Sequence, residues 1–101
     1  ICLDTANIPY HPQAYEMAEM GFIPAGAYRN RNYAGPGIKK GPKITRAMED
    51  ICYDPQTSGG LLMALPAEAW KECLAALRES IPQAAVIGRV TRRSEYAVYL
   101  N

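Results

Sequence analysis

The sequence has few of the residues that build metal sites, and no long apolar run. Its 101 residues include three cysteines and one histidine, and no two cysteines have Cys-x-x-Cys spacing. A zinc site needs three or four such ligands at suitable spacings, so no metal site is expected here. No apolar run approaches the roughly 20 residues of a membrane span, and we recognise no signal peptide. Reduced thiols and a cytoplasmic location are the expectation.

An excess of charge of one sign is also missing. Lys and Arg number 11, and Asp and Glu number 10, which leaves a formal net charge of +1. A chain with so little net charge has no strong attraction for nucleic acid or a membrane, and we expect neither as a partner. Hydrophobic residues make up 49% of the sequence and charged residues 21%, as in an ordinary globular domain.

Motifs for nucleotide binding and nucleophilic catalysis are absent as well. Neither a P-loop nor a Gly-x-Gly-x-x-Gly segment occurs. The single histidine, His11, has no evident nucleophile partner, so no catalytic residue is assigned to this chain. Glu49, Asp50 and Asp54 have the oxygen ligands that magnesium prefers, but a carboxylate beside a core strand more often buttresses a loop. No metal ligand is therefore assigned.

The most informative stretch that is present runs from Asp54 to Leu62. Polar side chains and two glycines precede an apolar run, and glycine allows another backbone or a ligand to approach closely. One interpretation is a loop that contacts a ligand or an interface, including an anion held by backbone N–H groups. The simpler one is a turn whose polar side chains bond their own backbone. The candidate residues of this loop are Asp54, Gln56, Thr57, Ser58, Gly59 and Gly60.

A basic segment lies upstream of that loop. Residues 22–43 are rich in glycine and proline and predict a flexible loop. Between residues 28 and 46 the charged side chains are all basic, and tyrosines are interleaved. A solvated loop is the simpler interpretation, and a module that binds RNA or a phosphate-bearing ligand is the alternative. The basic residues are Arg29, Arg31, Lys39, Lys40, Lys43 and Arg46.

Periodicity predicts an α+β fold. Helical spacing predicts helices at 13–20, with Ala14, Met17 and Ala18 facing inward, and at 44–51. A further helix is predicted to open at Pro66. Strands are predicted at 1–8, 61–65, 84–90 and 96–100. Residues 61–101 then read as strand, helix, strand, strand. We expect helices packed on one side of a mixed, mostly antiparallel sheet, an α/β layer arrangement in which Leu61–Leu65 is a strand covered on both faces.

Three segments together resemble the selenophosphate synthetase (selenide, water dikinase) family of the aminoimidazole ribonucleotide synthetase-like superfamily. The first is Asp54 to Leu62, which resembles the signature in the C-terminal half of these enzymes. The second is Ile23-Pro24-Ala25-Gly26-Ala27-Tyr28-Arg29-Asn30, in which Ala25 stands where a glycine is common. The third, Ala85 to Val90, resembles a closing strand. The order and spacing of the segments also fit the family.

The resemblance implies an enzyme that makes selenophosphate, AMP and phosphate from selenide, ATP and water. It implies that ATP and Mg²⁺ are held mainly by an N-terminal domain, which also carries the reactive Cys or selenocysteine and a Lys. None of those motifs occurs here. Arg29 and Asn30 match the family segment and are candidates for contact with a partner domain or an anionic group, since guanidinium groups suit carboxylate and phosphate.

We therefore expect residues 1–101 to be one partial domain, the later part of the C-terminal domain of a longer enzyme. The chain also starts at Ile1 rather than Met. It is expected to bind no cofactor and to be inactive alone, with the missing N-terminal ATP-binding domain as its partner. Exposed strand edges would favour a homodimer or other self-association. Another ATP-dependent enzyme of the superfamily, in purine synthesis or hydrogenase maturation, is the alternative.

Overall fold

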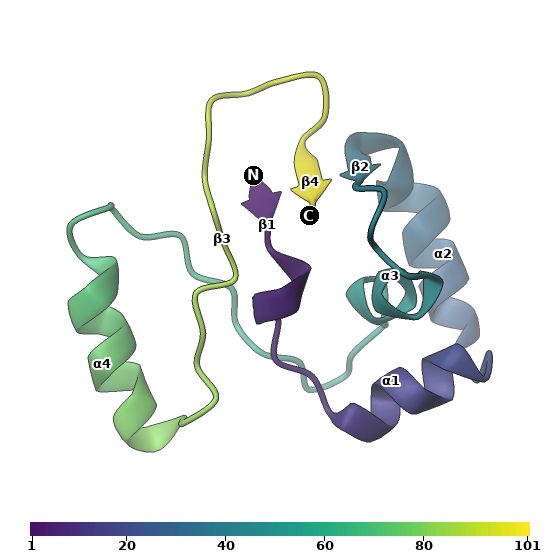
Figure 1. Ribbon diagram of the computed structural model, residues 1–101, viewed down its shortest axis with the longest axis horizontal. Helices are drawn as coiled ribbons and strands as arrows, with labels where there is room; N and C mark the ends of the chain where they lie inside the picture. The colour runs from purple at the N-terminus through teal and green to yellow at the C-terminus, as the bar shows by residue number, and fades with distance from the viewer.

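The computed structural model describes all 101 residues. Four short strands lie in the middle of the molecule, and four helices stand around them (Figure 1). The strands are β1 (Cys2–Leu3), β2 (Ile38–Lys40), β3 (Gly88–Arg89) and β4 (Val98–Leu100). The helices are α1 (Pro12–Glu19), α2 (Ala25–Ala34), α3 (Arg46–Cys52) and α4 (Trp70–Ser80), with 3-10 turns η1 (Thr5–Asn7) and η2 (Gly35–Gly37).

The strands form one mixed sheet in the order β2-β4-β1-β3. Strand β1 pairs antiparallel with β3 and parallel with β4, and β2 pairs parallel with β4. The α+β class and the mixed sheet are confirmed, but two of the three pairings are parallel, so "mostly antiparallel" is wrong. Paired strands here are joined through helices or long connections, which let a strand return in the same direction.

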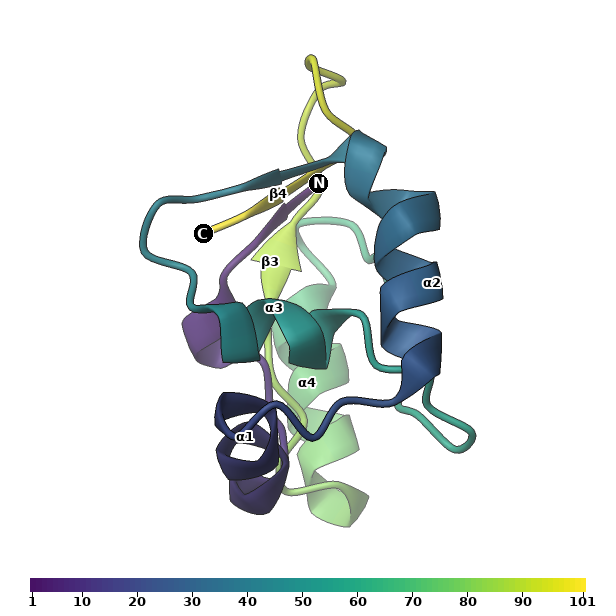
Figure 2. The same cartoon turned by 90° about the vertical axis from the view of Figure 1, so that its right-hand side faces the viewer.

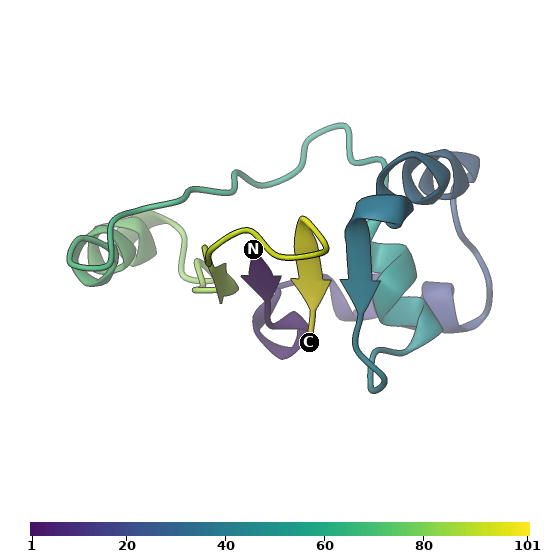
Figure 3. The same cartoon turned by 90° about the horizontal axis from the view of Figure 1, so that it is seen from above.

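The helices stand in two groups. Helices α1, α2 and α3 gather beyond the β2 edge of the sheet, while α4 lies beyond β3 (Figures 1 and 3). Helix α3 packs closely on α1, and Figure 2 shows it between α1 and the sheet. Helix α4 makes few contacts with the other elements. The helices therefore do not form one continuous layer over the sheet.

Two predicted helices are confirmed at α1 and α3. Pro12 is the first residue of α1, and Gly21 follows its end with a φ of 82°, a left-handed conformation that favours glycine. Thr45 caps α3 through a hydrogen bond that its Oγ1 accepts from Met48 N at 3.1 Å. The inward placement is wrong for Ala14 and Met17, which are exposed, while Ala18 is half-buried. No helix of the structure has the length and apolar character needed to cross a membrane.

The loop predicted over residues 22–43 is wrong for residues 25–40, where α2, η2 and β2 form instead. Proline and glycine lie mostly at the borders of these elements. Pro24 is the N-cap of α2, and η2 follows the end of that helix. Between those borders the sequence AGAYRNRNYA contains only Gly26 as a helix-weakening residue. The loop prediction failed because it counted glycine and proline over the whole of residues 22–43 and took no account of where they stand.

The buried core strand predicted at Leu61–Leu65 is also wrong. Leu61 is 95% exposed, and residues 57–65 make no backbone hydrogen bond. A strand needs a neighbour whose N–H and C=O groups pair with its own. None of the four strands of the sheet pairs with this run. The run instead belongs to the long connection between α3 and α4 (Figure 3).

The other strand predictions and the start of α4 need smaller corrections. The strand expected at 1–8 is reduced to β1, because Thr5–Asn7 form a 3-10 turn capped by Asp4. The strands expected at 84–90 and at 96–100 are reduced to β3 and β4. Helix α4 begins at Trp70 rather than at Pro66.

The core lies where α2, α3 and β4 meet, and it is small. Eight of the 101 residues are buried, and no large side chain is fully enclosed. Much of the apolar surface therefore stays in contact with solvent, α4 included. The buried residues are Thr5, Gly26, Ala27, Ala47, Met48, Asp50, Tyr53 and Leu100.

Candidate functional site

The structure brings two of the three family-like segments together at one place. Gly26, in the first turn of α2, packs directly on Pro55 of the signature loop. A Cβ atom on Gly26 would lie 2.6 Å from Pro55 Cγ, so only glycine fits at this contact without a shift. Asn30, one turn further along α2, donates a hydrogen bond from Nδ2 to the Tyr53 carbonyl at 2.9 Å. Helix α2 therefore holds the start of the loop.

A cluster of ion pairs lies beside this contact. The Asp50 side chain, which is 1% exposed, accepts hydrogen bonds from Arg31 Nη2 and from Arg46 Nε, the latter at 3.2 Å. Glu49 pairs with Lys40 Nζ at 2.9 Å and lies 3.5 Å from Arg31 Nε. Three cations from α2, β2 and α3 thus surround two adjacent carboxylates. The cluster ties these elements together.

Arg31 connects the ion-pair cluster to the loop. Its guanidinium carbon lies 5.2 Å from the centre of the Tyr53 ring and 5.9 Å from that of Tyr28, distances typical of cation–π contacts. Arg31 Nε is buried without a hydrogen-bond partner, although Glu49 Oε1 lies within ion-pair distance at 3.5 Å. Tyr53 is itself buried and stands immediately before Asp54.

Two groups at the end of α3 have shifted pKa values. Burial, followed by the charge of Glu49, raises the pKa of the Tyr53 hydroxyl, while the Arg31 guanidinium opposes that shift. The pKa of the Cys52 thiol is also raised, by desolvation first and by Glu49 second. Much of the Cys52 residue is nevertheless exposed, so its thiol is only partly desolvated. Both groups are neutral at pH 7, and neither is an activated nucleophile.

The candidate residues of the loop lie on the surface. All residues from Asp54 to Gly60 are exposed, and residues 57–60 make no hydrogen bond within the chain. The Gln56 side chain folds back against Gly59, where a Cβ atom would collide with it. The only glycine with a positive φ is Gly21. The loop thus has no left-handed glycine to form the anion-binding turn considered above.

Arg29 and Asn30 have different surroundings although they are adjacent in sequence. Asn30 is engaged by Tyr53, as described above. Arg29 is exposed and makes no ion pair, and its Nη2 lies near the contact between Gly26 and Pro55. Among the candidates, Arg29 is therefore the cation free to meet a group outside this chain.

The carboxylates present do not fit a resident magnesium ion. No three His, Cys, Asp or Glu side chains lie close enough together to hold a metal. Glu49 and Asp50 are neutralised by arginine and lysine, and Asp54 stands apart on the exposed loop. Magnesium prefers several oxygen ligands around one ion. We therefore derive no step through a metal bound to this chain.

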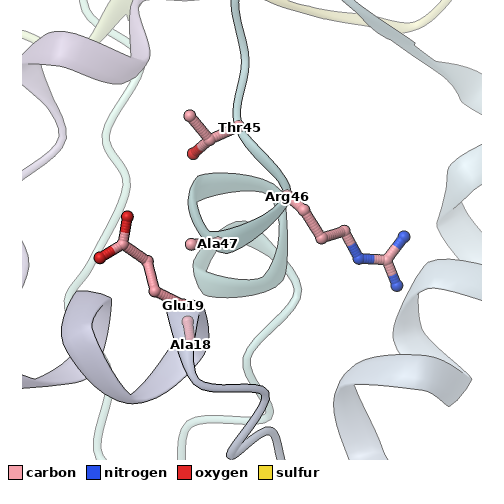
Figure 4. A pocket seen from close by; sticks show the side chains of 5 residues that line it. All are labelled: Ala18, Glu19, Thr45, Arg46 and Ala47. Carbon is pink, nitrogen blue, oxygen red and sulfur yellow. The ribbon is translucent and has the colours of Figure 1, made fainter.

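The cavity drawn in Figure 4 is not a convincing site either. It has a volume of about 290 Å³ and lies between α1 and α3. In Figure 4 the polar side chains of Glu19 and Arg46 extend in different directions and do not converge on a common point. The pocket contains none of the candidate residues and is open to solvent. Its lining residues are Ala18, Glu19, Thr45, Arg46 and Ala47.

Sequence reasoning missed Arg31, Asp50 and Tyr53 as parts of this site. Arg31 was counted among the basic residues of a loop, and Asp50 only as a magnesium ligand with Glu49. One signal was available: Arg46 and Asp50 stand four residues apart, the spacing of an ion pair on a helix. Arg31 and Asp50 are 19 positions apart in the sequence, so no local sequence pattern predicts their contact.

The fold and the site define a small α+β domain that presents an anchored polar loop. The family model described as AIR synthase related protein, C-terminal domain, matches residues 5–101. The match covers nearly the whole chain, and the chain belongs to this family.

Three curated relatives share the name selenide, water dikinase. The chain is 44% identical over 86 residues to the selenide, water dikinase of Pelobacter propionicus, a match covering 84% of this chain and 25% of that protein. It is 41% identical over 102 residues to the same-named protein of Treponema denticola, covering 92% of this chain and 27% of the relative. For Desulfitobacterium hafniense the identity is 37% over 101 residues, covering 100% and 29%. The chain thus spans less than a third of these relatives.

Proposed function

We propose that this chain is the C-terminal portion of an ATP-dependent selenophosphate synthetase, which converts selenide, ATP and water into selenophosphate, AMP and phosphate. The observation that carries the proposal is the contact between α2 and the signature loop. Gly26 and Asn30 of one family-like segment hold Tyr53 and Pro55 at the start of the other. Relatives that share 37–44% identity with this chain are named selenide, water dikinase, which supports the same conclusion.

In this proposal the chain supplies scaffold and an interface rather than chemistry. ATP and Mg²⁺ bind to an N-terminal ATP-binding domain that also contributes the nucleophile. The exposed loop from Asp54 to Gly60 and the free guanidinium of Arg29 are the groups offered to that domain or to its bound anion. The complete enzyme is a cytoplasmic homodimer, and this chain alone is inactive.

The geometry gives less support to a binding module built on the basic segment. Of its six cations, Arg31, Lys40 and Arg46 are engaged by Glu49 and Asp50. Lys39 lies over the Tyr96 ring, with Nζ 5.4 Å from its centre. Only Arg29 and Lys43 remain without such a contact, too few for a strong electrostatic surface.

The test is to express the chain joined to the N-terminal portion of a relative and to measure AMP formation from ATP with and without selenide. The 101-residue chain alone is the control. Selenide-dependent AMP from the combined protein only is the expected result. A folded combined protein that hydrolyses ATP without any dependence on selenide would contradict the proposal and favour another ATP-dependent enzyme of the superfamily.

A further inference from the structure

We propose that Arg31 is a positioning residue for the loop from Tyr53 to Gly60. Its guanidinium, held by the buried Asp50, presses on the Tyr53 ring and so fixes the direction in which the loop leaves α3. The consequence for turnover rests on the proposed function, while the effect on the loop itself does not.

The contacts of Arg31 are those of an anchored group. It projects from the last turn of α2, its side chain is 15% exposed, and its Nη2 donates to the buried Asp50 carboxylate. Arg46 Nε holds the other carboxylate oxygen of Asp50, so the carboxylate cannot turn away. The guanidinium is in this way fixed between Asp50 and the ring of Tyr53, 5.2 Å from the ring centre.

The loop depends on this anchor because only its beginning is attached. Tyr53 is fixed by its ring on Arg31 and by its carbonyl on Asn30, and Pro55 is fixed by Gly26. Residues 57–60 make no hydrogen bond with the rest of the chain. The orientation of the exposed residues is therefore set at Tyr53, and a tilt of that ring moves the whole loop.

Arginine is required by the geometry rather than by charge alone. Lysine at this position retains a positive charge for Asp50, but it has neither the planar face that lies on an aromatic ring nor the fork that meets two oxygen atoms. The variant Arg31→Lys thus separates the positioning contact from simple charge neutralisation. Tyr53→Leu removes the ring, whereas Tyr53→Phe retains it and removes only the hydroxyl.

The first readout is the mobility of the loop, measured by hydrogen–deuterium exchange of the complete enzyme. We expect R31K and Y53L to speed exchange severalfold at the hydrogen-bonded amides that begin the loop, those of Tyr53, Asp54 and Gln56. Exchange in α1 should stay unchanged, and Y53F should behave like wild type. The matched control is Arg93→Lys, since Arg93 is exposed and makes no ion pair. Unchanged exchange at the amides of residues 53–56 in a folded R31K enzyme would overturn the proposal. So would uniform acceleration across α1, α2 and α3, which marks a purely structural role.

Steady-state kinetics supply the second readout. A displaced group near the reaction lowers kcat by about tenfold to a hundredfold, and we expect R31K to do so with KM for ATP within about twofold of wild type. R93K should retain wild-type kcat. A normal kcat in R31K, despite faster loop exchange, would overturn the link between the loop and turnover. If wild type itself makes no selenide-dependent AMP, the proposed function fails while the exchange result still decides the role of Arg31.

Discussion

At the scale of single residues, Gly26 meets a steric requirement set by a rigid neighbour, the ring of Pro55. Its missing side chain allows Pro55 to reach α2, and a Cβ atom would stand 2.6 Å from Pro55 Cγ and 2.9 Å from Pro55 Cβ. Because the pyrrolidine ring is rigid, the loop and not a flexible side chain would have to move. The helix and the signature loop are thus coupled through one glycine.

Gly26→Ala should therefore lower the free energy of unfolding by about 1–3 kcal/mol, the usual cost of forcing an extra methyl group into a packed contact. Urea denaturation followed by circular dichroism measures it. Gly60→Ala is the matched control, since nothing lies within 4 Å of a Cβ atom there, and it should change stability by less than about 0.5 kcal/mol. Equal effects of the two substitutions would refute the steric argument.

Also at the residue scale, Cys52 makes the stability of the folded chain depend on pH. Desolvation and Glu49 raise the pKa of its thiol above the usual value of 9.0, so the folded chain binds that proton more tightly than the unfolded chain does. The resulting stabilisation is present at lower pH and is lost as the pH rises above about 9.

We expect the stability of wild type to fall more steeply than that of Cys52→Ala between about pH 8 and 10.5. Denaturation midpoints measured across this range give the two slopes. Cys73→Ala, which removes a thiol on α4, is the control and should follow wild type. Parallel profiles for wild type and C52A would show that the thiol contributes nothing.

At the scale of elements, Thr45 decides where α3 begins. Its Oγ1 accepts the hydrogen bond from Met48 N and also lies 3.0 Å from Tyr15 Oη, so one hydroxyl caps α3 and joins it to α1. The end of the same helix leads through Tyr53 into the loop. The position of α3 thus contributes to the direction of the signature segment.

Thr45→Ala should cost about 1 kcal/mol of stability, since it leaves an N-terminal N–H of the helix without a partner. Thr45→Ser retains the hydroxyl and should recover most of that loss. Thermal unfolding of the three proteins measures the difference. A T45S protein as unstable as T45A would indicate that the methyl group, and not the cap, is responsible.

At the scale of the whole molecule, many large apolar side chains are exposed to solvent, because only eight residues are buried. The exposed residues include consecutive members of the run before Pro66, and such contiguous surface marks an interaction site. The unpaired backbone of the same run is a template for strand pairing with another chain. Its exposed large side chains are Leu61, Leu62, Met63 and Leu65.

We therefore expect the 101-residue chain to self-associate in a concentration-dependent way, measurable by sedimentation velocity. Replacing Leu61 and Leu62 together by serine should reduce association and change the free energy of unfolding by less than about 0.5 kcal/mol. Tyr33→Ser, at a single aromatic residue that is 92% exposed, is the control and should leave association unchanged. A monomeric wild type, or strong destabilisation by the serine pair, would contradict this picture.

The sequence by itself determined the features that depend on near neighbours. Pro12 and Gly21 predicted the ends of α1, and the composition of residues 54–60 indicated a polar loop. Helix α3 was predicted from the helical spacing of Ile44, Ala47, Met48 and Ile51. The family resemblance also needed only short runs of sequence. In each case the physical cause lies within about one helical turn or one tight turn, so a short window of residues contains it.

Only the tertiary structure decided how these pieces meet. It paired Arg31 with Asp50, placed Gly26 against Pro55, and left Leu61–Leu65 outside the sheet although its composition suits a strand. Whether an apolar run becomes a strand depends on a partner strand elsewhere in the chain, and which cation meets a carboxylate depends on how helices pack. These are long-range conditions, and no local pattern of residues expresses them.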